Sequence, residues 1–326
     1  MTSTAGEYKK ISALVDEWLE LHKGEKFDLD LICRQLEIRE RGNRHQVSRK
    51  LSYEVLSEKA NLEKDGRFYR FIDRSIKSID WVSAEEGDIL KEIKFPYGIE
   101  DDSHFGFEDC MVVSPGDILV IAGNSNAGKT AFCLNFLANN MDKFLCTLMG
   151  NEYKPAKFKR RLKRMTWVNP LKEDGTPKFE LIDRRDNWKD IIRPDNINII
   201  DWIGLPGDES YRIGQIIDGI QSKLKKGIAL LSLQKDIEAR LGRGRSYSEE
   251  LASLYLTIDF ERITVIKAKE WKGTNPNGKM YGFTLLNAGT QFHNIREIKK
   301  CPKCWGKNPK CEKCEGTGYI DIAEDF

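Results

Sequence analysis

Residues 121–132 read IAGNSNAGKTAF, and this turn constrains the fold more than any other stretch of the chain. The apolar run DILVIAG leads into it, and TAFCLNFLANN, which has helical spacing, follows. Gly123, Gly128, Lys129 and Thr130 fit the pattern G-x-x-x-x-G-K-[ST], a glycine-rich loop that joins a strand to a helix around bound phosphates. The alternative is a glycine-rich turn with a chance lysine, and the elements predicted on both sides argue against it.

The turn predicts a site for a nucleoside triphosphate. Main-chain N–H groups and the positive end of the helix dipole favour anions there. Lys129 would balance charge on the β and γ phosphates, and Thr130 would ligate Mg²⁺. We expect ATP, because the chain has no Asn-Lys-x-Asp run that would read guanine. The predicted nucleotide contacts are Gly123, Asn124, Ser125, Asn126, Ala127, Gly128, Lys129, Thr130 and Ala131.

Between residues 95 and 298 the sequence alternates strand-like runs with helical stretches. The runs are DILVIAG, FLCTLMG, NINIIDWIG, GIALLSLQ and RITVIKAKE. Strands separated by helices indicate a mainly parallel sheet covered by helices on both faces. We therefore predict an α/β domain of the P-loop NTPase kind over this range.

Two of the predicted strands end near a carboxylate, which hydrolysis requires beside the metal and the attacking water. NINIID ends in Asp201, at the edge of a parallel sheet where ligands bind. FLCTLMGNEYKP carries Glu152, the better candidate for a general base. Taken alone, each acid could equally be an ordinary turn or helix-capping residue.

Taken together, these features resemble the RecA-like P-loop ATPases, in particular the ATPase core of DnaB-type replicative helicases. The resemblance covers roughly residues 95–298 and is carried by GDILVIAGNSNAGKTAFCLNF, LMGNEYKPAKFKRRL, NINIID and ALLSLQKD. It implies a RecA-like fold in which Lys129 and Thr130 contact phosphates and magnesium. It also implies Glu152 as the catalytic base, Asp201 at the metal, and Gln234 as a γ-phosphate sensor that links ATP to DNA.

RecA-like motors also take a cation from the neighbouring subunit, as arginine fingers do. The resemblance places Lys267 and Lys269, in VIKAKEWKGTNPNGK, roughly at the positions of such residues. It thereby implies a homo-oligomer, with a hexamer as one form. No arginine stands there, only Trp271 and Lys272 nearby, so the identity of the finger and the hexamer itself are left open.

A basic loop follows Gln234, in KDIEARLGRGRSYSEEL. Arg240, Arg243 and Arg245 alternate there with glycines, and a flexible backbone with several guanidinium groups suits the phosphates of single-stranded DNA. An exposed basic loop without a partner is the alternative. The other basic stretch, KPAKFKRRLKRM, has its apolar residues on one side, and we predict a surface helix that covers the sheet.

Residues 1–74 show helical periodicity three times and then a hairpin signal. The first helix lies in YKKISALVDEWLELHKG, the second follows DLD, and the third starts at Asn43. The Asp65-Gly66 pair predicts a tight hairpin. Three helices followed by a hairpin is the order of a winged helix, and residues 75–94 are expected to form a linker.

The outward face of the third helix would carry donors suited to phosphates and base edges in the major groove of duplex DNA. The predicted DNA contacts on this face are Arg44, Gln46, Arg49 and Lys50. A solvated helix in a domain that binds protein is the alternative.

Residues 299–326 hold four of the eight cysteines, in the spacing C-x2-C-x6-C-x2-C. Thiolates at this spacing can enclose one tetrahedral Zn²⁺, and with all four positions filled the ion would be structural. Disulfide or redox chemistry is the alternative, which an intracellular setting disfavours. CEGTG resembles the cysteine repeats of DnaJ-type chaperones over a few residues only. The predicted ligands are Cys301, Cys304, Cys311 and Cys314. The lysines around them could contact nucleic acid or only maintain solubility.

The chain has 53 Lys+Arg against 51 Asp+Glu, so nucleic-acid binding would have to come from local patches. No apolar run approaches the roughly 20 residues of a membrane span, and we expect a cytoplasmic protein. The combined prediction is an ATP-dependent, helicase-like DNA ATPase of replication or recombination. An ATP-controlled loader or regulator without unwinding, and a DNA-binding regulator that only senses nucleotide, are the alternatives.

Overall fold

The chain divides into the units Met1–Ala84 and Glu85–Phe326, and each unit has its own hydrophobic packing, with one core cluster in the first and two large clusters in the second. The computed structural model describes residues 5–22, 25–57, 60–72, 92–205, 207–237 and 239–322. The predicted linker, residues 75–94, lies outside the described residues except at its last positions. Each unit is described by itself below.

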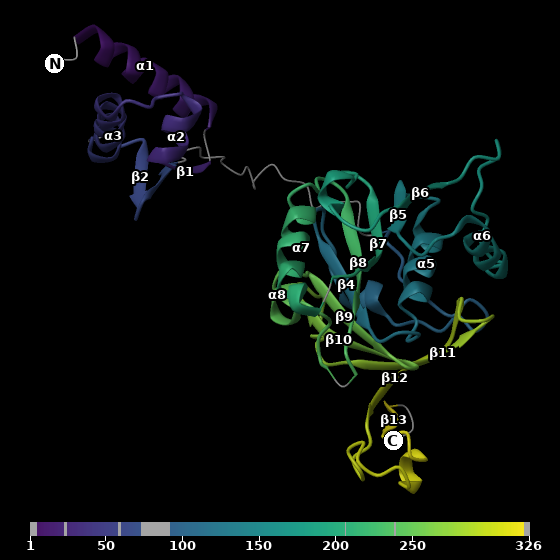
Figure 1. The fold of residues 1–326 in the computed structure, drawn as a ribbon. Coiled ribbons are helices and arrows are strands. Elements are labelled where there is room, and N and C mark those ends of the chain that lie inside the picture. Colours follow the sequence, from purple (N-terminus) through teal and green to yellow (C-terminus); the bar gives the residue numbers. More distant parts are fainter. Residues whose placement is uncertain are drawn as a thin grey trace. The chain divides into compact units, whose positions relative to one another are not determined.

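The first unit contains three helices and a small antiparallel sheet in the order β1-β3-β2 (Figure 1). The side chain of Asp28 accepts a hydrogen bond of 2.9 Å from the Leu31 N–H, which caps the second helix. The predicted hairpin is confirmed, because Asp65 pairs with Phe68 across the turn. The elements are α1 (Ala5–Leu21), β1 (Lys26–Asp28), α2 (Leu29–Gln35), α3 (Arg41–Leu56), β2 (Leu62–Asp65) and β3 (Phe68–Phe71).

One local prediction for this unit was wrong, and one strand was not predicted. The third helix begins at Arg41, so Asn43 lies inside it and Glu40 occupies the N-cap without a side-chain hydrogen bond. The strand β1 was not predicted, because three residues are too few to show a period. It is fixed instead by pairing with β3, where Phe27 lies opposite Tyr69 in the core.

The second unit is built on one sheet in the order β13-β12-β11-β10-β9-β4-β8-β7-β5-β6. From β9 to β6, each strand runs parallel to its neighbour, which confirms the mainly parallel sheet. These strands are β4 (Ile118–Gly123), β5 (Cys146–Gly150), β6 (Phe179–Asp183), β7 (Ile197–Ile203), β8 (Ile228–Gln234) and β9 (Leu254–Asp259). The sequence analysis missed β6 and β9.

An antiparallel extension continues the sheet beyond β9. Asp259 pairs with Arg262, so only two residues connect β9 to β10, and a strand that follows so short a turn must reverse direction. The added strands are β10 (Arg262–Ala268), β11 (Met280–Leu286), β12 (Gln291–Lys300) and β13 (Tyr319–Asp321). The predicted boundary between residues 298 and 299 falls inside β12, and β13 pairs with that strand.

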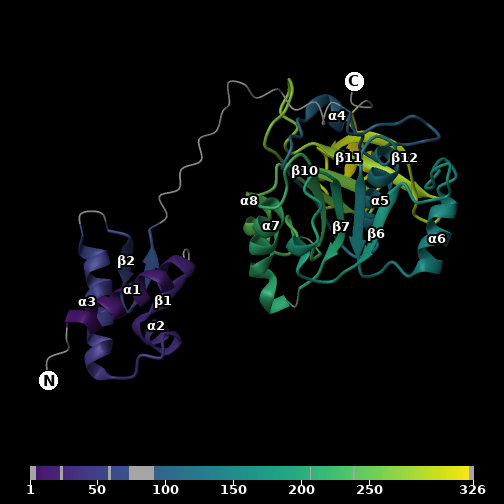
Figure 2. The same ribbon diagram turned by 90° about the horizontal axis from the view of Figure 1, so that it is seen from above.

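Helices cover both faces of the parallel strands, as predicted (Figures 1 and 2). On one face lie α5 (Lys129–Asn140) and α6 (Pro155–Arg164), and on the other lie α7 (Ile213–Gln221) and α8 (Arg245–Glu250). Shorter helices are α4 (Phe107–Cys110) and the 3₁₀ turns Trp188–Asp190, Gly207–Arg212 and Glu312–Cys314. Among the helices that the structure describes, none has the length and apolar character that crossing a bilayer requires.

Phe292 tests the core of the second unit, because its fully buried ring contacts Phe105, Phe132 and Phe283. Phe292→Ala should lower the free energy of unfolding by about 3–5 kcal/mol through lost burial and a residual cavity. Urea denaturation measures this loss. The exposed ring of Phe260 is the matched control, and Phe260→Ala should change stability by less than about 0.5 kcal/mol. Equal effects of the two substitutions would contradict this account of the core.

Candidate functional site

The glycine-rich turn connects the end of β4 to the start of α5, which confirms the predicted strand-turn-helix order. The buried Nζ of Lys129 donates hydrogen bonds to the carbonyl oxygens of Gly123 (2.8 Å) and Asn124 (2.7 Å). Gly128 occupies the N-cap of α5 with φ 109°, a backbone conformation that glycine adopts without strain. Carbonyl oxygens of the turn therefore accept hydrogen bonds from the lysine at the end of the same turn.

A pocket of about 440 Å³ opens beside this turn. Residues from the turn, from the ends of β5, β7 and β8, from α6 and from the β11–β12 connection line it. The parallel strands bring these carboxyl ends to one edge of the sheet, where α/β proteins bind ligands. The lining residues are Ser125, Asn126, Gly128, Lys129, Thr130, Ala131, Glu152, Tyr153, Lys157, Phe158, Arg161, Asp201, Trp202, Gln234, Leu285, Ala288 and Gly289.

Gln234 contacts the turn directly, as its predicted position suggested. Its Oε1 accepts a hydrogen bond of 3.3 Å from Lys129 Nζ, and its Nε2 donates one of 3.2 Å to Ser125 Oγ. Burial lowers the pKa of Lys129 below its ordinary value, while the carboxylates of Asp201 and Glu152 act against that shift. The ammonium group thus lies in a partly desolvated position among neutral oxygens.

The two acids predicted from strand ends lie in the same pocket and are held by aromatic residues. Asp201 is 4% exposed, and its Oδ2 accepts a hydrogen bond of 2.6 Å from the Tyr153 hydroxyl. Its Oδ1 is buried without a hydrogen-bond partner among the described residues. Glu152 Oε1 accepts a hydrogen bond of 3.0 Å from Trp202 Nε1. The peptide bond between Asp201 and Trp202 is cis.

Tyr153 was missed by the sequence analysis, although it follows Glu152 directly. Burial raises the pKa of its hydroxyl well above the ordinary value, and the negative charge of Asp201 raises it further. The hydroxyl therefore stays protonated and donates to the carboxylate. Nothing in the local pattern distinguished this tyrosine from a core residue.

The helix α6 is more than the surface cover that we predicted. Lys157 and Arg161 line the pocket and lie one helical turn apart, while Phe158 is buried in the core between them. The sequence showed the cations but not the direction in which they point. That direction is set by the packing of Phe158 against Tyr153, which lies just before α6, and against Phe179 in β6.

Lys267 and Lys269 are not among the described residues that line this pocket. Lys267 Nζ instead donates to the carbonyl oxygens of Glu249 (2.7 Å) and Glu250 (3.0 Å) at the end of α8. Lys269 is exposed. Neither residue therefore lies at the glycine-rich turn of its own chain, and Lys267 has a structural role at a helix terminus.

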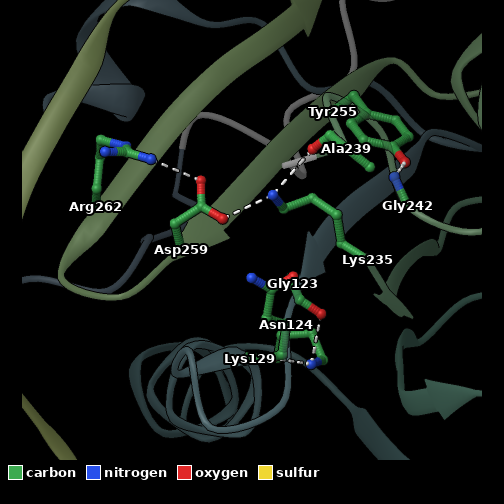
Figure 3. Close-up of polar contacts among 9 residues, drawn as sticks. All are labelled: Gly123, Asn124, Lys129, Lys235, Ala239, Gly242, Tyr255, Asp259 and Arg262. Atoms are coloured by element: carbon green, nitrogen blue, oxygen red, sulfur yellow. Dashed lines mark hydrogen bonds and ion pairs between the residues drawn. The ribbon is translucent and has the colours of Figure 1, made fainter. Parts of the chain in front are cut away.

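The loop after β8, predicted to be flexible, is fastened at its base (Figure 3). Lys235 is buried, and its Nζ lies 2.7 Å from Asp259 Oδ1 and 3.0 Å from the carbonyl oxygen of Ala239. Asp259 also pairs with Arg262 at 3.0 Å. Further along the loop, the Gly242 N–H donates to the Tyr255 hydroxyl at 2.9 Å.

The three arginines predicted for this loop differ in position and exposure, because Arg240 and Arg243 lie in the loop whereas Arg245 is the first residue of α8. Arg240 and Arg245 are exposed, whereas Arg243 is partly buried and lies 3.8 Å from Asp236. The Arg243 N–H also donates to the Gln234 carbonyl oxygen at 2.7 Å. The loop thus begins after Gln234, which contacts the glycine-rich turn, and returns to it through this hydrogen bond.

On α3 of the first unit, the predicted DNA contacts are only partly available. Lys50 pairs with Asp16 at 2.9 Å and with Glu54 at 2.8 Å, so this lysine is already committed within the unit. Arg44 pairs with Asp30, and Gln46 is partly buried. Arg49 is exposed, as predicted for an outward-facing cation.

The four C-terminal cysteines converge, as their spacing predicted. Their Sγ atoms all lie within 4.8 Å of one another, with 3.9 Å between Cys301 and Cys311 and 3.5 Å between Cys304 and Cys314. Tetrahedral coordination at a Zn–S distance of about 2.3 Å places sulfur atoms about 3.8 Å apart. These separations fit such a site and are far longer than a disulfide bond of about 2.05 Å. The cluster can bind a metal such as zinc.

No protein-family model matches the sequence, and the comparison with curated proteins gives no match. The assignment of function therefore depends on the residues of the pocket, the loop after β8 and the cysteine cluster.

The cysteine cluster gives a direct test. Cys301→Ser should reduce bound zinc from about one equivalent per chain to near zero, because three thiolates hold a structural ion poorly. Metal analysis of the purified protein measures the loss. Cys110→Ser changes a cysteine outside the cluster and should leave the zinc content unchanged. Retention of zinc by the Cys301 variant would exclude the four-cysteine site.

The Lys235–Asp259 pair makes stability depend on pH. Although burial acts in the opposite direction, hydrogen bonds with Lys235 and Arg262 hold the pKa of Asp259 below its ordinary value. The resulting stabilisation is present above the unfolded-state pKa of about 3.9 and is lost as the pH falls through the lower folded-state pKa. Lys235→Met should cost about 3 kcal/mol near neutral pH, since it leaves a partly buried carboxylate with one partner fewer.

Urea denaturation between acidic and neutral pH measures both effects. Arg193, which pairs with Glu180 on the surface at 2.8 Å, is the control. Arg193→Met should cost less than about 1 kcal/mol. If Lys235→Met lowers the free energy of unfolding by no more than Arg193→Met does, the buried Lys235–Asp259 pair contributes little to stability.

Proposed function

We propose that the chain is an ATP hydrolase of the RecA-like P-loop class that couples turnover to movement on DNA or to its remodelling. The observation that carries the proposal is the convergence of Lys129, Glu152, Asp201 and Gln234 on one pocket beside the glycine-rich turn. These residues come from four separate stretches of the chain, and each has the chemistry that phosphoryl transfer to water requires. The strand that carries the turn, β4, lies between β8 and β9, which supports the RecA-like assignment.

The pocket fits a triphosphate with magnesium. Among the described residues, the buried ammonium of Lys129 has only neutral groups as hydrogen-bond partners, and a buried cation is stabilised by an added anion. Asp201 offers a buried carboxylate oxygen with no described partner, and the Thr130 side chain lies in the same pocket. Hard oxygen donors of this kind are the ligands that Mg²⁺ takes. When bound, magnesium would neutralise charge on the phosphate oxygens.

Glu152 is the proposed general base. Its carboxylate lines the pocket, and the hydrogen bond from Trp202 Nε1 fixes its orientation. A carboxylate held in this way can accept a proton from the attacking water. Lys157 and Arg161 add positive charge from the same chain, which can stabilise the negative charge of the transferred phosphoryl group.

The loop after β8 is the proposed contact for single-stranded DNA. The exposed Arg240 and Arg245 can bind backbone phosphates, and the exposed Ile237 gives the loop an apolar contact. The Arg243 N–H of the loop donates to the Gln234 carbonyl oxygen. A displacement of Gln234 on nucleotide binding or hydrolysis would therefore move the loop directly. We further propose that residues 1–74 form a winged helix that contacts duplex DNA through exposed residues such as Arg49.

A homo-oligomer, with a hexamer as one form, remains part of the proposal. The exposed Lys269 is free to act on a neighbouring subunit, whereas Lys267 is bound to the end of α8. This commitment of Lys267 favours a second candidate function, an ATP-controlled loader or regulator that binds DNA and a protein partner without unwinding. Such a protein requires a conformational change that depends on the bound nucleotide. It does not require coordinated ATP hydrolysis among the subunits of a ring.

ATP turnover by the purified full-length protein tests the proposal. Glu152→Gln should retain ATP binding while the turnover rate falls by about 10²- to 10⁴-fold, the usual contribution of a general base. Lys129→Ala should lose both binding and turnover, because it removes the cation of the phosphate site. Calorimetry with ATP and magnesium measures binding, and phosphate release measures turnover.

The exposed loop residues Lys172 and Glu173 supply matched controls, and Lys172→Ala and Glu173→Gln should behave as wild type. Single-stranded DNA should accelerate turnover if the chain is a motor. An ATP turnover rate that no nucleic acid changes would favour the loader. A wild-type protein that binds no ATP would exclude both functions.

A further inference from the structure

An exposed tryptophan marks the cysteine knuckle, which we define as residues 301–318. Trp305 is 65% exposed, although tryptophan is largely buried on average in folded proteins. The small core of the knuckle, formed by the four cysteines and Ile320, does not include its ring among the described residues. The indole therefore contributes little to the folding of this segment.

The backbone holds Trp305 in place. Its φ of 52° is in the left-handed region, which bulky residues rarely adopt and which glycine or asparagine would adopt at lower cost. The Trp305 N–H donates to the Cys301 carbonyl oxygen at 2.8 Å, and the Lys307 N–H donates to that of Cys304 at 2.9 Å. The turn is therefore fixed by the metal-binding cysteines on both sides. Strained backbone positions cluster at functional sites, so a large exposed ring at such a position points to a binding role for the ring itself.

The surface around the ring is basic and hydrophilic. Within residues 301–318 the chain carries four lysines and two glutamates. Lys303 lies 3.8 Å from Glu312, and both side chains are exposed, so this pair is weak. Among the described residues Lys307 and Lys310 form no ion pair. Among the described residues of this segment, Trp305 is the exposed large hydrophobic residue, so the ring stands alone on a polar surface.

The knuckle is tied to the ten-stranded sheet. β13 pairs with β12, Arg296 Nε lies 2.8 Å from Asp321 Oδ1, and the guanidinium of Arg262 lies 4.3 Å from the centroid of the Tyr319 ring. A ligand on Trp305 would thus be held by the unit that contains the nucleotide pocket.

We propose that the cysteine knuckle binds single-stranded nucleic acid, with a base stacked on Trp305 and phosphates beside Lys303 and Lys307. Unpaired bases present the aromatic faces that such a platform requires, whereas bases in a duplex are already stacked. A divalent ion held by four thiolates keeps a net negative charge beneath this surface. We therefore expect stacking to provide more of the affinity than charge. The inference stands on the knuckle alone and does not depend on ATP turnover.

Fluorescence anisotropy of the zinc-loaded full-length protein, without ATP, tests the site. The probes are a labelled oligothymidylate, an abasic oligonucleotide of equal length, and the duplex. Trp305→Ala should weaken oligothymidylate binding about tenfold or more, while Trp305→Phe should keep most of the affinity. Trp271, which is 42% exposed and lies outside the knuckle, is the matched control, and Trp271→Ala should bind as wild type.

Zinc content and circular dichroism of each variant show whether the knuckle remains folded. The emission of Trp305, obtained as the difference between wild type and Trp305→Ala, should be quenched by oligothymidylate and not by the abasic strand. Undiminished affinity of Trp305→Ala for oligothymidylate, an abasic strand that wild type binds as tightly as oligothymidylate, or no binding of oligothymidylate by wild type would overturn the proposal. The last result would point to a protein partner. Duplex binding, which we propose for the first unit, should be the same in wild type and Trp305→Ala. Because ATP is absent, a failure here is distinguishable from a failure of the hydrolase.

Discussion

The buried ammonium group of Lys129 is the interaction on which the pocket depends. β4 lies inside the sheet between β8 and β9, and the glycine-rich turn leads from its end to Lys129. The Lys129 side chain is buried there and has little access to water. Carbonyl oxygens of Gly123 and Asn124 satisfy part of its hydrogen-bonding capacity, and they also close the turn around it. A buried cation without a hydrogen-bonded carboxylate is costly unless an anion arrives. The triphosphate that we propose for this pocket would supply such an anion.

Alternation along β8 connects this site to the loop beyond it. Successive side chains of a strand point to opposite faces, so Gln234 contacts Lys129 and Ser125 while Lys235 points toward Asp259. Figure 3 shows the second set of contacts, with Asp259 between Lys235 and Arg262. Two consecutive residues therefore contact the glycine-rich turn and the base of the basic loop. A movement of the strand end would change both sets of contacts together.

The same sheet extends to the cysteine knuckle. Arg262 pairs with Asp259 through one contact and covers the ring of Tyr319 through another. Tyr319 begins β13, the strand that returns from the cysteines to pair with β12. The metal-binding segment is thus an insertion between two paired strands, and a metal there would replace the apolar core that a short segment cannot build.

The sequence by itself determined the features that arise from neighbours in the chain. The spacing of Gly123, Gly128 and Lys129 between two apolar runs specified the turn, and the two Cys-x2-Cys pairs specified the cluster, because both depend on short-range geometry. The strand ends carrying Glu152 and Asp201 were predictable for the same reason, since parallel strands end at a shared edge.

The tertiary structure decided what depends on distant contacts. Packing of Phe158 turned Lys157 and Arg161 toward the pocket, and burial of Tyr153 against Asp201 added a hydroxyl that no local pattern indicated. The commitments of Lys50 and Lys267 to partners within their own units likewise depend on neighbouring elements. Local periodicity shows which residues are apolar. The directions of these polar side chains depend on how neighbouring elements pack against them, which periodicity does not show.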